Sequence, residues 1–171
     1  DLSGRFVPNE RAAEMAPALS RRLLAREDEE RIFVLHWQGE DGDIENAVYL
    51  SQRDVRELQF AKASIDTGWS LLVQELGIDV SEIQQVLLAG SFGSYLSPAS
   101  AVRIGLVPRL ALPRIVSAGN VAGEGAKMAL LSMQERHAAT AMFDEVEYVE
   151  LSDREDFNDR FVELLAFPGA R

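Results

Sequence analysis

The sequence predicts an α/β domain in which helices flank a sheet. Short apolar segments alternate with helical segments after residue 80, which is the order expected of a layered α/β fold. A long amphipathic helix is predicted just before this alternation, from Gln52 to Leu76. The chain has 171 residues, of which 47% are hydrophobic and 26% charged, and these values are typical of one folded domain.

The N-terminal part predicts a helix followed by a hairpin. Asn9 is placed to cap a helix that runs to about Arg26, and Pro17 should strain or break that helix. The charged run from Arg26 to Arg31 is expected to be a solvated face or loop. Two apolar segments and a glycine-rich turn then predict a hairpin. The two strands are expected at 32–37 and 45–50, and the turn between them at 39–43.

The long helix carries signals at both of its ends. Ser51 and Asp54 match the pattern in which each side chain accepts a hydrogen bond from the backbone at the helix start. Gly77 is placed to end the helix in the left-handed conformation. At 100° per residue the apolar positions of this segment fall on one narrow stripe. They are Val55, Leu58, Ile65, Trp69, Leu72 and Leu76. We expect Trp69, near the centre of the stripe, to lie in the core.

Two strands that end in glycine are predicted in the second half. The segment 83–90 is the first, and Ser97 with Pro98 then starts a short helix that Gly105 closes. The second is 114–119. Asn120 is expected to cap a helix of small residues that runs on to about residue 138.

The C-terminal region predicts one more strand and one more helix. Alternation of apolar and polar residues over 145–151 is typical of a half-exposed strand. Ser152 and Glu155 form a second capping pattern, which should open a last helix that stops before Pro168. Its buried positions are expected to be Phe157, Phe161 and Leu164.

The composition excludes several classes of site. With no cysteine, the chain cannot form a disulfide or hold a thiolate-bound zinc ion or an iron–sulfur cluster. It has only two histidines, so we expect no metal site. The net charge of −11 argues against a general nucleic-acid surface. No apolar run is long enough to cross a membrane, and we expect a cytoplasmic protein. Because the sequence opens without Met, we expect a piece of a longer protein.

The turn after the first glycine-ended strand is the leading candidate for a ligand site. Gly90, Ser91, Phe92 and Gly93 bring backbone to the carboxyl end of a strand, which is where α/β folds bind ligands. Glycine allows positive φ angles and lets a ligand approach the main chain closely. A tight strand-to-helix turn with no ligand explains the same residues equally well.

Two other positions share this ambiguity. Gly119 and Asn120 open the segment GNVAGEG, where glycines serve either close packing of helix on strand or contact with a ligand. On the long helix Lys62 lies beside the apolar stripe, with Gln59 and Asp66 on the same flank. Its ammonium must therefore reach solvent, pair with Asp66 or meet a ligand.

Four segments, taken in order, resemble the C-terminal domain of the reductive activators of corrinoid proteins. The resemblance covers about Val48 to Pro168. The segments are SQRDVRELQFAKASI, VLLAGSFGSYLSPASAVRIGLVP, IVSAGNVAGEGAKMALLS and VEYVELSDREDFNDRFVELLAFP. This family belongs to the acetate and sugar kinase, heat-shock cognate and actin (ASKHA) superfamily. The resemblance therefore implies an actin-like or ribonuclease H-like ATPase lobe, one half of an ASKHA fold, with a mixed sheet and flanking helices.

The resemblance also implies a function. Full-length members carry an N-terminal [2Fe–2S] ferredoxin domain and use ATP with Mg²⁺ to reduce a corrinoid protein from Co(II) to Co(I) for methyl transfer. It further implies that residues 1–171 form a single C-terminal ATP-binding lobe. Within it, 1–47 would be a peripheral helix and hairpin strand and 48–171 the nucleotide-binding core. The ferredoxin domain and the first ATPase lobe would then lie outside this chain.

The resemblance assigns roles to the candidate residues. Gly90, Ser91, Phe92 and Gly93 match the adenosine motif of the superfamily, although Ser91 stands where the usual motif has a second glycine. The helix with Gln59 and Lys62 would flank the adenine. Gly119 and Asn120 open the second connecting motif, a hinge and packing element between lobes.

The resemblance also shows what the chain lacks. The D-x-G-type loop that holds phosphates and Mg²⁺ is absent, so no catalytic or metal-binding residue is assigned and we expect this chain to be inactive by itself.

Two other functions fit the same residues. An actin-like lobe could activate another client, such as a radical dehydratase. Alternatively, the chain could be a non-enzymatic docking or dimerisation lobe with a vestigial nucleotide pocket. A corrinoid protein of a methyltransferase system is the expected partner, and a homodimer is possible because a lobe without its neighbour exposes apolar surface.

Overall fold

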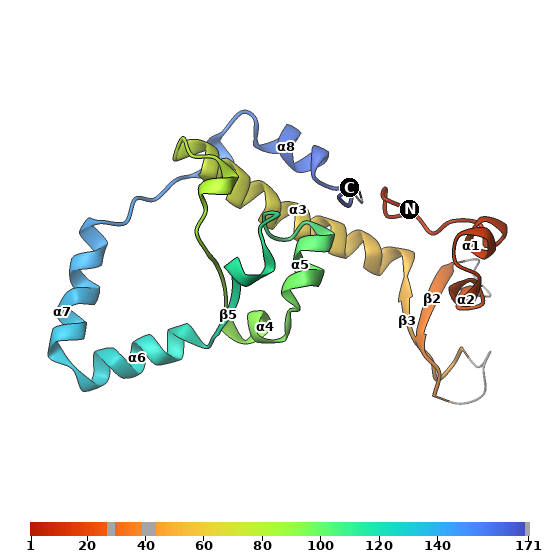
Figure 1. Ribbon diagram of the computed structural model, residues 1–171, viewed down its shortest axis with the longest axis horizontal. Coiled ribbons are helices and arrows are strands. Elements are labelled where there is room, and N and C mark those ends of the chain that lie inside the picture. The colour runs from red at the N-terminus through yellow and green to blue at the C-terminus, as the bar shows by residue number, and fades with distance from the viewer. Residues whose placement is uncertain (27–29, 39–43, 170–171) are drawn as a thin grey trace. The chain divides into compact units, whose positions relative to one another are not determined.

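The computed structural model describes residues 1–26, 30–38 and 44–169, and the chain divides into two compact units. The first unit comprises Asp1–Ser64 and the segment from Glu163 onwards, and the second comprises Ile65–Val162. Helix α3 (Gln52–Glu75) contributes residues to both units (Figure 1). No helix within the described ranges is both long and apolar enough to cross a bilayer.

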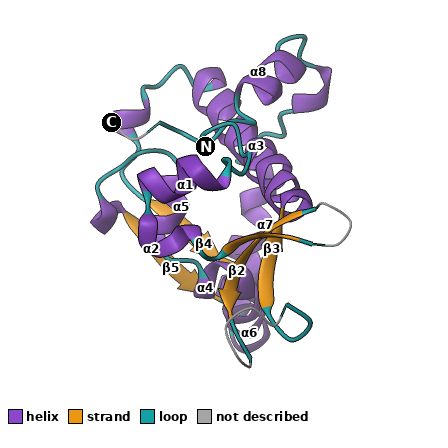
Figure 2. Cartoon of the chain, turned by 90° about the vertical axis from the view of Figure 1, so that its right-hand side faces the viewer, coloured by secondary structure: helices purple, strands orange, loops and turns teal. Residues whose placement is uncertain are grey.

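The first unit is built on an antiparallel sheet of three strands, β1 (Leu23–Ala25), β2 (Arg31–His36) and β3 (Val48–Ser51), in the order β1-β2-β3. Strands β2 and β3 lie side by side in Figure 2. The pairing joins Leu23 to Phe33 and Val34 to Tyr49. Ile32 and Val34 on β2 are fully buried and anchor this sheet. Two short helices, α1 (Asn9–Met15) and α2 (Pro17–Ser20), precede the sheet in the chain.

The predicted hairpin is confirmed, and so is the break at Pro17, but the cap and the end predicted for the first helix are wrong. Pro17 divides it, because Ala16 before the proline adopts an extended φ of −152°. Pro8 occupies the N-cap position of α1, and the Asn9 side chain instead accepts a hydrogen bond from Arg31. The helical segment stops at Ser20, and a short strand follows where the helix was expected to continue. The turn predicted at 39–43 lies outside the described residues.

Helix α3 begins and ends as predicted. The Ser51 N–H donates to the Asp54 carboxylate at 2.8 Å, and the Asp54 N–H donates to the Ser51 hydroxyl at 3.2 Å. Gly77 adopts a φ of +65°, and the N–H of Ile78 reaches back to the Val73 carbonyl at 3.3 Å. These are the bonds of a capping box and of a left-handed C-terminal cap.

The buried face of α3 is not the apolar stripe. Leu58, Ile65 and Leu72 are 44%, 51% and 40% exposed, and Trp69 is only half-buried rather than a core residue. Apart from Leu71, the buried face carries small and polar side chains instead. Its members are Gln59, Lys62, Ala63, Asp66, Thr67 and Leu71. Periodicity therefore predicted the helix correctly and its buried side incorrectly.

The second unit contains a parallel pair of strands, β4 (Val86–Ala89) and β5 (Ile115–Gly119). Helix α4 (Gly90–Tyr95) starts directly at the end of β4, where a turn was predicted. Helix α5 (Pro98–Ile104) begins at the predicted Ser97 cap and ends at Gly105, which has a φ of +79°. The core of this unit consists of Leu88, Ala101, Leu106, Val107 and Ile115.

The segment after β5 forms two helices instead of one. Ser132 adopts an extended conformation that ends α6 (Val121–Leu131), and its hydroxyl then caps α7 (Met133–Ala141). The two helices follow one another around this bend (Figure 1). The guanidinium of Arg136 donates two hydrogen bonds to the Ala129 carbonyl, at 3.1 and 3.0 Å, and fixes the bend.

Two predictions for the C-terminal region are wrong. The segment 145–151 is no strand, since it pairs with no strand among the described residues, and Tyr148 is 80% exposed. Ser152 does not cap the last helix, because its N–H and hydroxyl both donate to Glu150. Helix α8 (Phe157–Glu163) therefore starts later than expected, and its Phe157 and Phe161 are half-buried.

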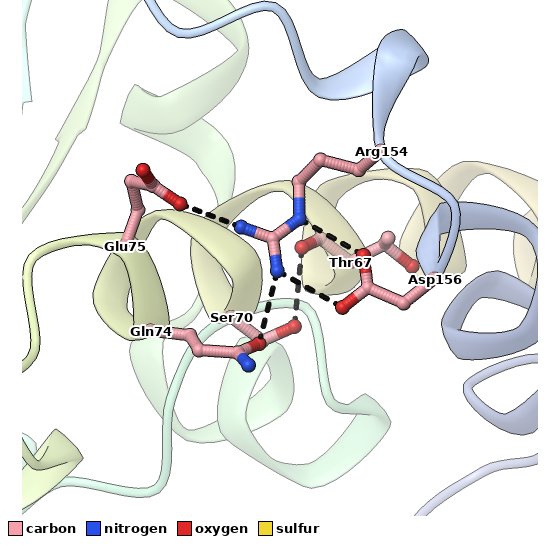
Figure 3. Close-up of polar contacts among 6 residues, drawn as sticks. All are labelled: Thr67, Ser70, Gln74, Glu75, Arg154 and Asp156. Carbon is pink, nitrogen blue, oxygen red and sulfur yellow. Dashed lines mark hydrogen bonds and ion pairs between the residues drawn. The ribbon is translucent and has the colours of Figure 1, made fainter.

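Arg154 holds the segment before α8 against the last turns of α3. Its guanidinium donates to Glu75 at 2.7 Å and forms two bonds of 2.9 Å with Asp156, as Figure 3 shows. A weaker contact of 3.5 Å reaches Gln74. Because a bidentate guanidinium–carboxylate pair is geometrically specific, this contact sets the path of an otherwise irregular segment.

Candidate nucleotide site

The two parallel strands end side by side in glycines of unusual conformation. Ala89 of β4 pairs with Gly119 of β5, so their carboxyl ends meet at one edge of the sheet. Gly90, which follows β4 and opens α4, has a φ of +86°, and Gly119 has a φ of +66°. Any L-residue pays a steric penalty in this left-handed region, so both positions favour glycine.

Open space lies over both of these glycines. Apart from the adjoining residues and the backbone of the same helix, no atom of the described chain lies within 4 Å of the position that a Cβ would take at Gly90 or at Gly119. A Cβ there would stand in the space above the strand ends, which is the region where α/β proteins bind ligands. The backbone at this edge can thus be approached closely from outside.

Gly93 is required for the packing of α4 against β4, and no open space lies at its Cβ position. A Cβ at Gly93 would lie 2.8 Å from both the carbonyl carbon and the carbonyl oxygen of Leu88, so only glycine lets α4 turn back against β4. The hydroxyl of Ser117 on β5 donates to the Gly93 carbonyl at 3.3 Å and ties α4 to the second strand. Sequence reasoning missed Ser117, because no signal in a single sequence reports which residue faces which across parallel strands.

Asn120 and Gly123 form the cap of α6. The side chain of Asn120 accepts a hydrogen bond of 3.1 Å from the Gly123 N–H, as predicted from its position. A Cβ at Gly123 would lie 2.6 Å from the Asn120 side chain, so this glycine makes room for the cap. Gly125, by contrast, has nothing in the described chain within 4 Å of its Cβ position.

Gln59 and Lys62 of the first unit are buried and bonded to the backbone. The Lys62 ammonium, 1% exposed, donates to the Ala166 carbonyl at 2.8 Å. The Gln59 amide donates to the carbonyls of Leu165 and Ser3, at 2.8 and 3.1 Å. Gln59 thus joins α3 to both ends of the chain, and Lys62 joins it to the C-terminal segment. Their contact with a nucleotide stays a prediction.

The remaining predicted residues lie around the start of α4. Ser91 is exposed in the first turn of this helix, and Phe92 follows it. The free backbone N–H groups at the starts of α4 and α6 give the edge a partial positive charge. No cluster of histidine, aspartate and glutamate that could hold a metal occurs in the described part of the chain. The edge therefore offers backbone donors and open space.

A comparison with protein families shows to which family the chain belongs. Residues 9–171 match the model described as the C-terminal domain of RACo, the ASKHA domain. The chain belongs to this family. The resemblance predicted from the four motifs is thereby confirmed, and so is the expected ASKHA-type α/β fold.

Two relatives support the membership in the RACo C-terminal family. The chain is 32% identical over 159 residues to the corrinoid activation enzyme RamQ of Eubacterium limosum, an alignment that covers 93% of this chain and 26% of RamQ. It also matches the structure of a reductive activator for corrinoid, iron-sulfur protein, with a TM-score of 0.80 and 29% identity. That match covers 98% of this chain and 25% of the activator. The chain thus spans about a quarter of the length of either relative.

Proposed function

We propose that this chain is the ATP-binding C-terminal part of a reductive activator of a corrinoid protein. In this proposal the longer polypeptide uses ATP to drive a one-electron reduction of the corrinoid cobalt from Co(II) to Co(I), the state needed for methyl transfer. Two relatives whose names describe corrinoid activation and reductive activation support this role.

One observation in the structure carries the nucleotide assignment. Gly90, which follows β4, and Gly119, the last residue of β5, leave open space where a Cβ would otherwise stand. A planar base or a ribose can approach bare backbone at such a position, and the adjoining helix starts supply N–H donors. In the proposal, Gly90, Ser91 and Phe92 contact the adenosine from one strand, and Gly119 and Asn120 contact it from the other.

The redox and phosphate chemistry must come from other parts of the polypeptide. This chain has no cysteine, so the [2Fe–2S] cluster that would deliver the electron cannot be held here. Mg²⁺ is bound through carboxylates together with the phosphates, and the described residues contain no cluster of carboxylates and histidines that could hold a metal. The proposal therefore places the adenosine contacts in this chain and the phosphate contacts in the preceding lobe.

A spectroscopic assay tests the proposed function. The full-length activator, a corrinoid protein in the Co(II) state, a low-potential reductant and Mg²⁺-ATP are combined under anaerobic conditions. The visible spectrum of the corrinoid should then change to that of Co(I), and it should stay unchanged without ATP. If the protein binds ATP but leaves the spectrum of every corrinoid protein tested unchanged, it serves a different client. Failure to bind ATP at all would contradict the nucleotide assignment itself.

A further inference from the structure

Residues 2–6 and residues 165–167 lie far apart in the sequence but are held by the same face of α3. We call them the entry segment and the exit segment. The Gln59 amide donates to the Ser3 carbonyl of the entry segment at 3.1 Å and to the Leu165 carbonyl of the exit segment at 2.8 Å. One side chain of α3 thus bonds both segments at once.

Further hydrogen bonds complete this arrangement, which we call the clasp. The Lys62 ammonium donates to a carbonyl of the exit segment at 2.8 Å. The Gln52 amide donates to a carbonyl of the entry segment at 2.6 Å and accepts from one of its N–H groups at 3.0 Å. The two segments also meet directly, since the Phe167 N–H donates to the Leu2 carbonyl at 2.8 Å. Because Gln59 and Lys62 are 3% and 1% exposed, water cannot easily replace these bonds.

Gly4 is the position of the entry segment at which the clasp leaves no room for a side chain. It has a φ of +77°, and a Cβ there would lie 2.5 Å from the amide carbon and 2.6 Å from the amide nitrogen of Gln59. The Gln59 side chain could give way only by leaving its two carbonyl partners. Gly77 has a similar φ of +65°, and nothing lies within 4 Å of its Cβ position apart from adjoining residues and the backbone of α3. Alanine at the two positions therefore differs in its contact with Gln59.

We infer that Gln59 and Lys62 are positioning residues of the proposed ATP site, which act by fixing the entry segment. The inference rests on the proposed function, in which this chain supplies the adenosine contacts and the preceding lobe supplies the phosphate contacts. In that function the polypeptide passes from the preceding lobe into this chain through the entry segment. A clasp on the entry segment therefore controls how the phosphate contacts are presented to a nucleotide that this chain holds.

The bonding of the two side chains favours this role over the direct contact with adenine that the resemblance implies. A glutamine amide has two N–H donors, and Gln59 uses both on backbone carbonyls. Its amide oxygen accepts from the Arg56 guanidinium at 3.2 Å. A nucleotide that took the donors of Gln59 or Lys62 would leave backbone carbonyls without their partners, and buried polar groups without partners are costly.

Lysine acetylation tests the clasp in the full-length protein. Lys62 and Lys127 are the two lysines of this chain, and the 67% exposed side chain of Lys127 serves as the internal standard. In the native wild type, N-hydroxysuccinimide acetate should modify Lys62 at least about tenfold more slowly than Lys127, as measured by peptide mass spectrometry. The rate at Lys62 should be at least about threefold higher in Gly4→Ala than in Gly77→Ala. Equal rates in either comparison would overturn the inference.

Binding of Mg²⁺-ATP and of adenosine then separates positioning from direct contact. By calorimetric titration of the full-length variants, Gly4→Ala should bind Mg²⁺-ATP at least about tenfold more weakly than Gly77→Ala, because misplaced phosphate contacts lose much of their effect. The two variants should bind adenosine within about twofold of each other. A similar loss for both ligands would mean that Gln59 touches the adenine, and an unchanged affinity for ATP would mean that the clasp does not serve the site. Either result would contradict the inference.

Gln59→Glu provides a second variant in case Gly4→Ala does not fold. Its carboxylate cannot donate to the two carbonyls, so it should give the same pattern of acetylation and binding. If the wild type binds no ATP, the proposed function fails and this inference fails with it. If the wild type binds ATP and the variants differ from it only in acetylation, this inference alone fails.

Discussion

The polar face of α3 and the glycines at the ends of β4 and β5 were both expected to contact a nucleotide. The structure shows that the side chains of the first are bonded within the protein, whereas the backbone of the second is open to a ligand. Gln59 and Lys62 carry the groups best suited to bind a ligand, but backbone carbonyls of the chain already accept their protons. Gly90 and Gly119 carry no functional group, and the space above them is open. The comparison teaches that a buried polar side chain tends to be used by the protein itself, whereas unobstructed backbone is a better sign of a ligand site.

The largest expected effect on stability is that of a substitution at Gly93, which packs against the backbone of Leu88. Gly93→Ala places a Cβ 2.8 Å from the Leu88 carbonyl group, and neither backbone can move away without disrupting β4. We expect a loss of about 3 kcal/mol in the free energy of unfolding, measured by urea denaturation. Gly125→Ala in α6 is the matched control. It meets nothing in the described chain and should stabilise the helix by up to about 1 kcal/mol. Equal effects of the two substitutions would contradict this account of Gly93.

Lys62→Met tests whether the buried polar face of α3 serves the fold or a ligand. The substitution retains much of the side-chain volume but leaves the Ala166 carbonyl without its ammonium donor, so we expect destabilisation of about 2 kcal/mol. Thermal denaturation followed by circular dichroism measures it. Lys127→Met, on a side chain that is 67% exposed, should change stability by less than about 0.5 kcal/mol. A stable Lys62→Met protein that has lost ATP affinity would show that Lys62 serves the ligand and not the fold.

Three glycines with positive φ should respond alike in stability. Apart from adjoining residues and the backbone of the same helix, alanine at Gly77, Gly90 or Gly119 meets no described atom within 4 Å, so backbone strain is the main cost of the substitution. Each substitution is expected to cost about 1 kcal/mol. Chemical denaturation of the three variants checks this, and a much larger cost at Gly90 or Gly119 would mean that the space above them is filled.

The smallest expected effect is the pH dependence of the α3 capping box. Hydrogen bonds from the Ser51 backbone and the Ser51 side chain lower the pKa of Asp54 below its ordinary value. A group whose pKa is lowered by folding contributes stability above its unfolded pKa and loses it as the pH falls through the folded value. Asp54→Asn should therefore be less stable than the wild type at neutral pH, and the difference should shrink below about pH 4. Melting curves between pH 3 and pH 7 test this. A difference that grows on acidification would contradict it.

The sequence predicted those features that depend on local chemistry. The capping box at Ser51, the left-handed cap at Gly77 and the Asn120 cap each involve residues within a few positions of one another, and all three are present. The family was also predictable, because four motifs in a fixed order are far more specific than one glycine pattern.

What the sequence could not predict depends on contacts between distant residues. The carbonyls of Leu165 and Ala166, which accept from Gln59 and Lys62, lie more than a hundred residues away in the chain, and no periodicity reports them. The alternation over 145–151 predicted a strand, but a strand needs a pairing partner that a local pattern does not supply. The exposed stripe of α3 has the same cause, since the side of a helix that is buried depends on what packs against it.

Calorimetric titration of the full-length protein with Mg²⁺-ATP tests the central claim most directly. Gly90→Ala and Gly119→Ala should bind ATP at least about tenfold more weakly than Gly77→Ala, a difference of about 1.4 kcal/mol in binding free energy. All three carry the same backbone strain, so a loss of affinity confined to the two strand ends would place the adenosine there. Wild-type affinity in all three variants would contradict the assignment of these glycines to the nucleotide site.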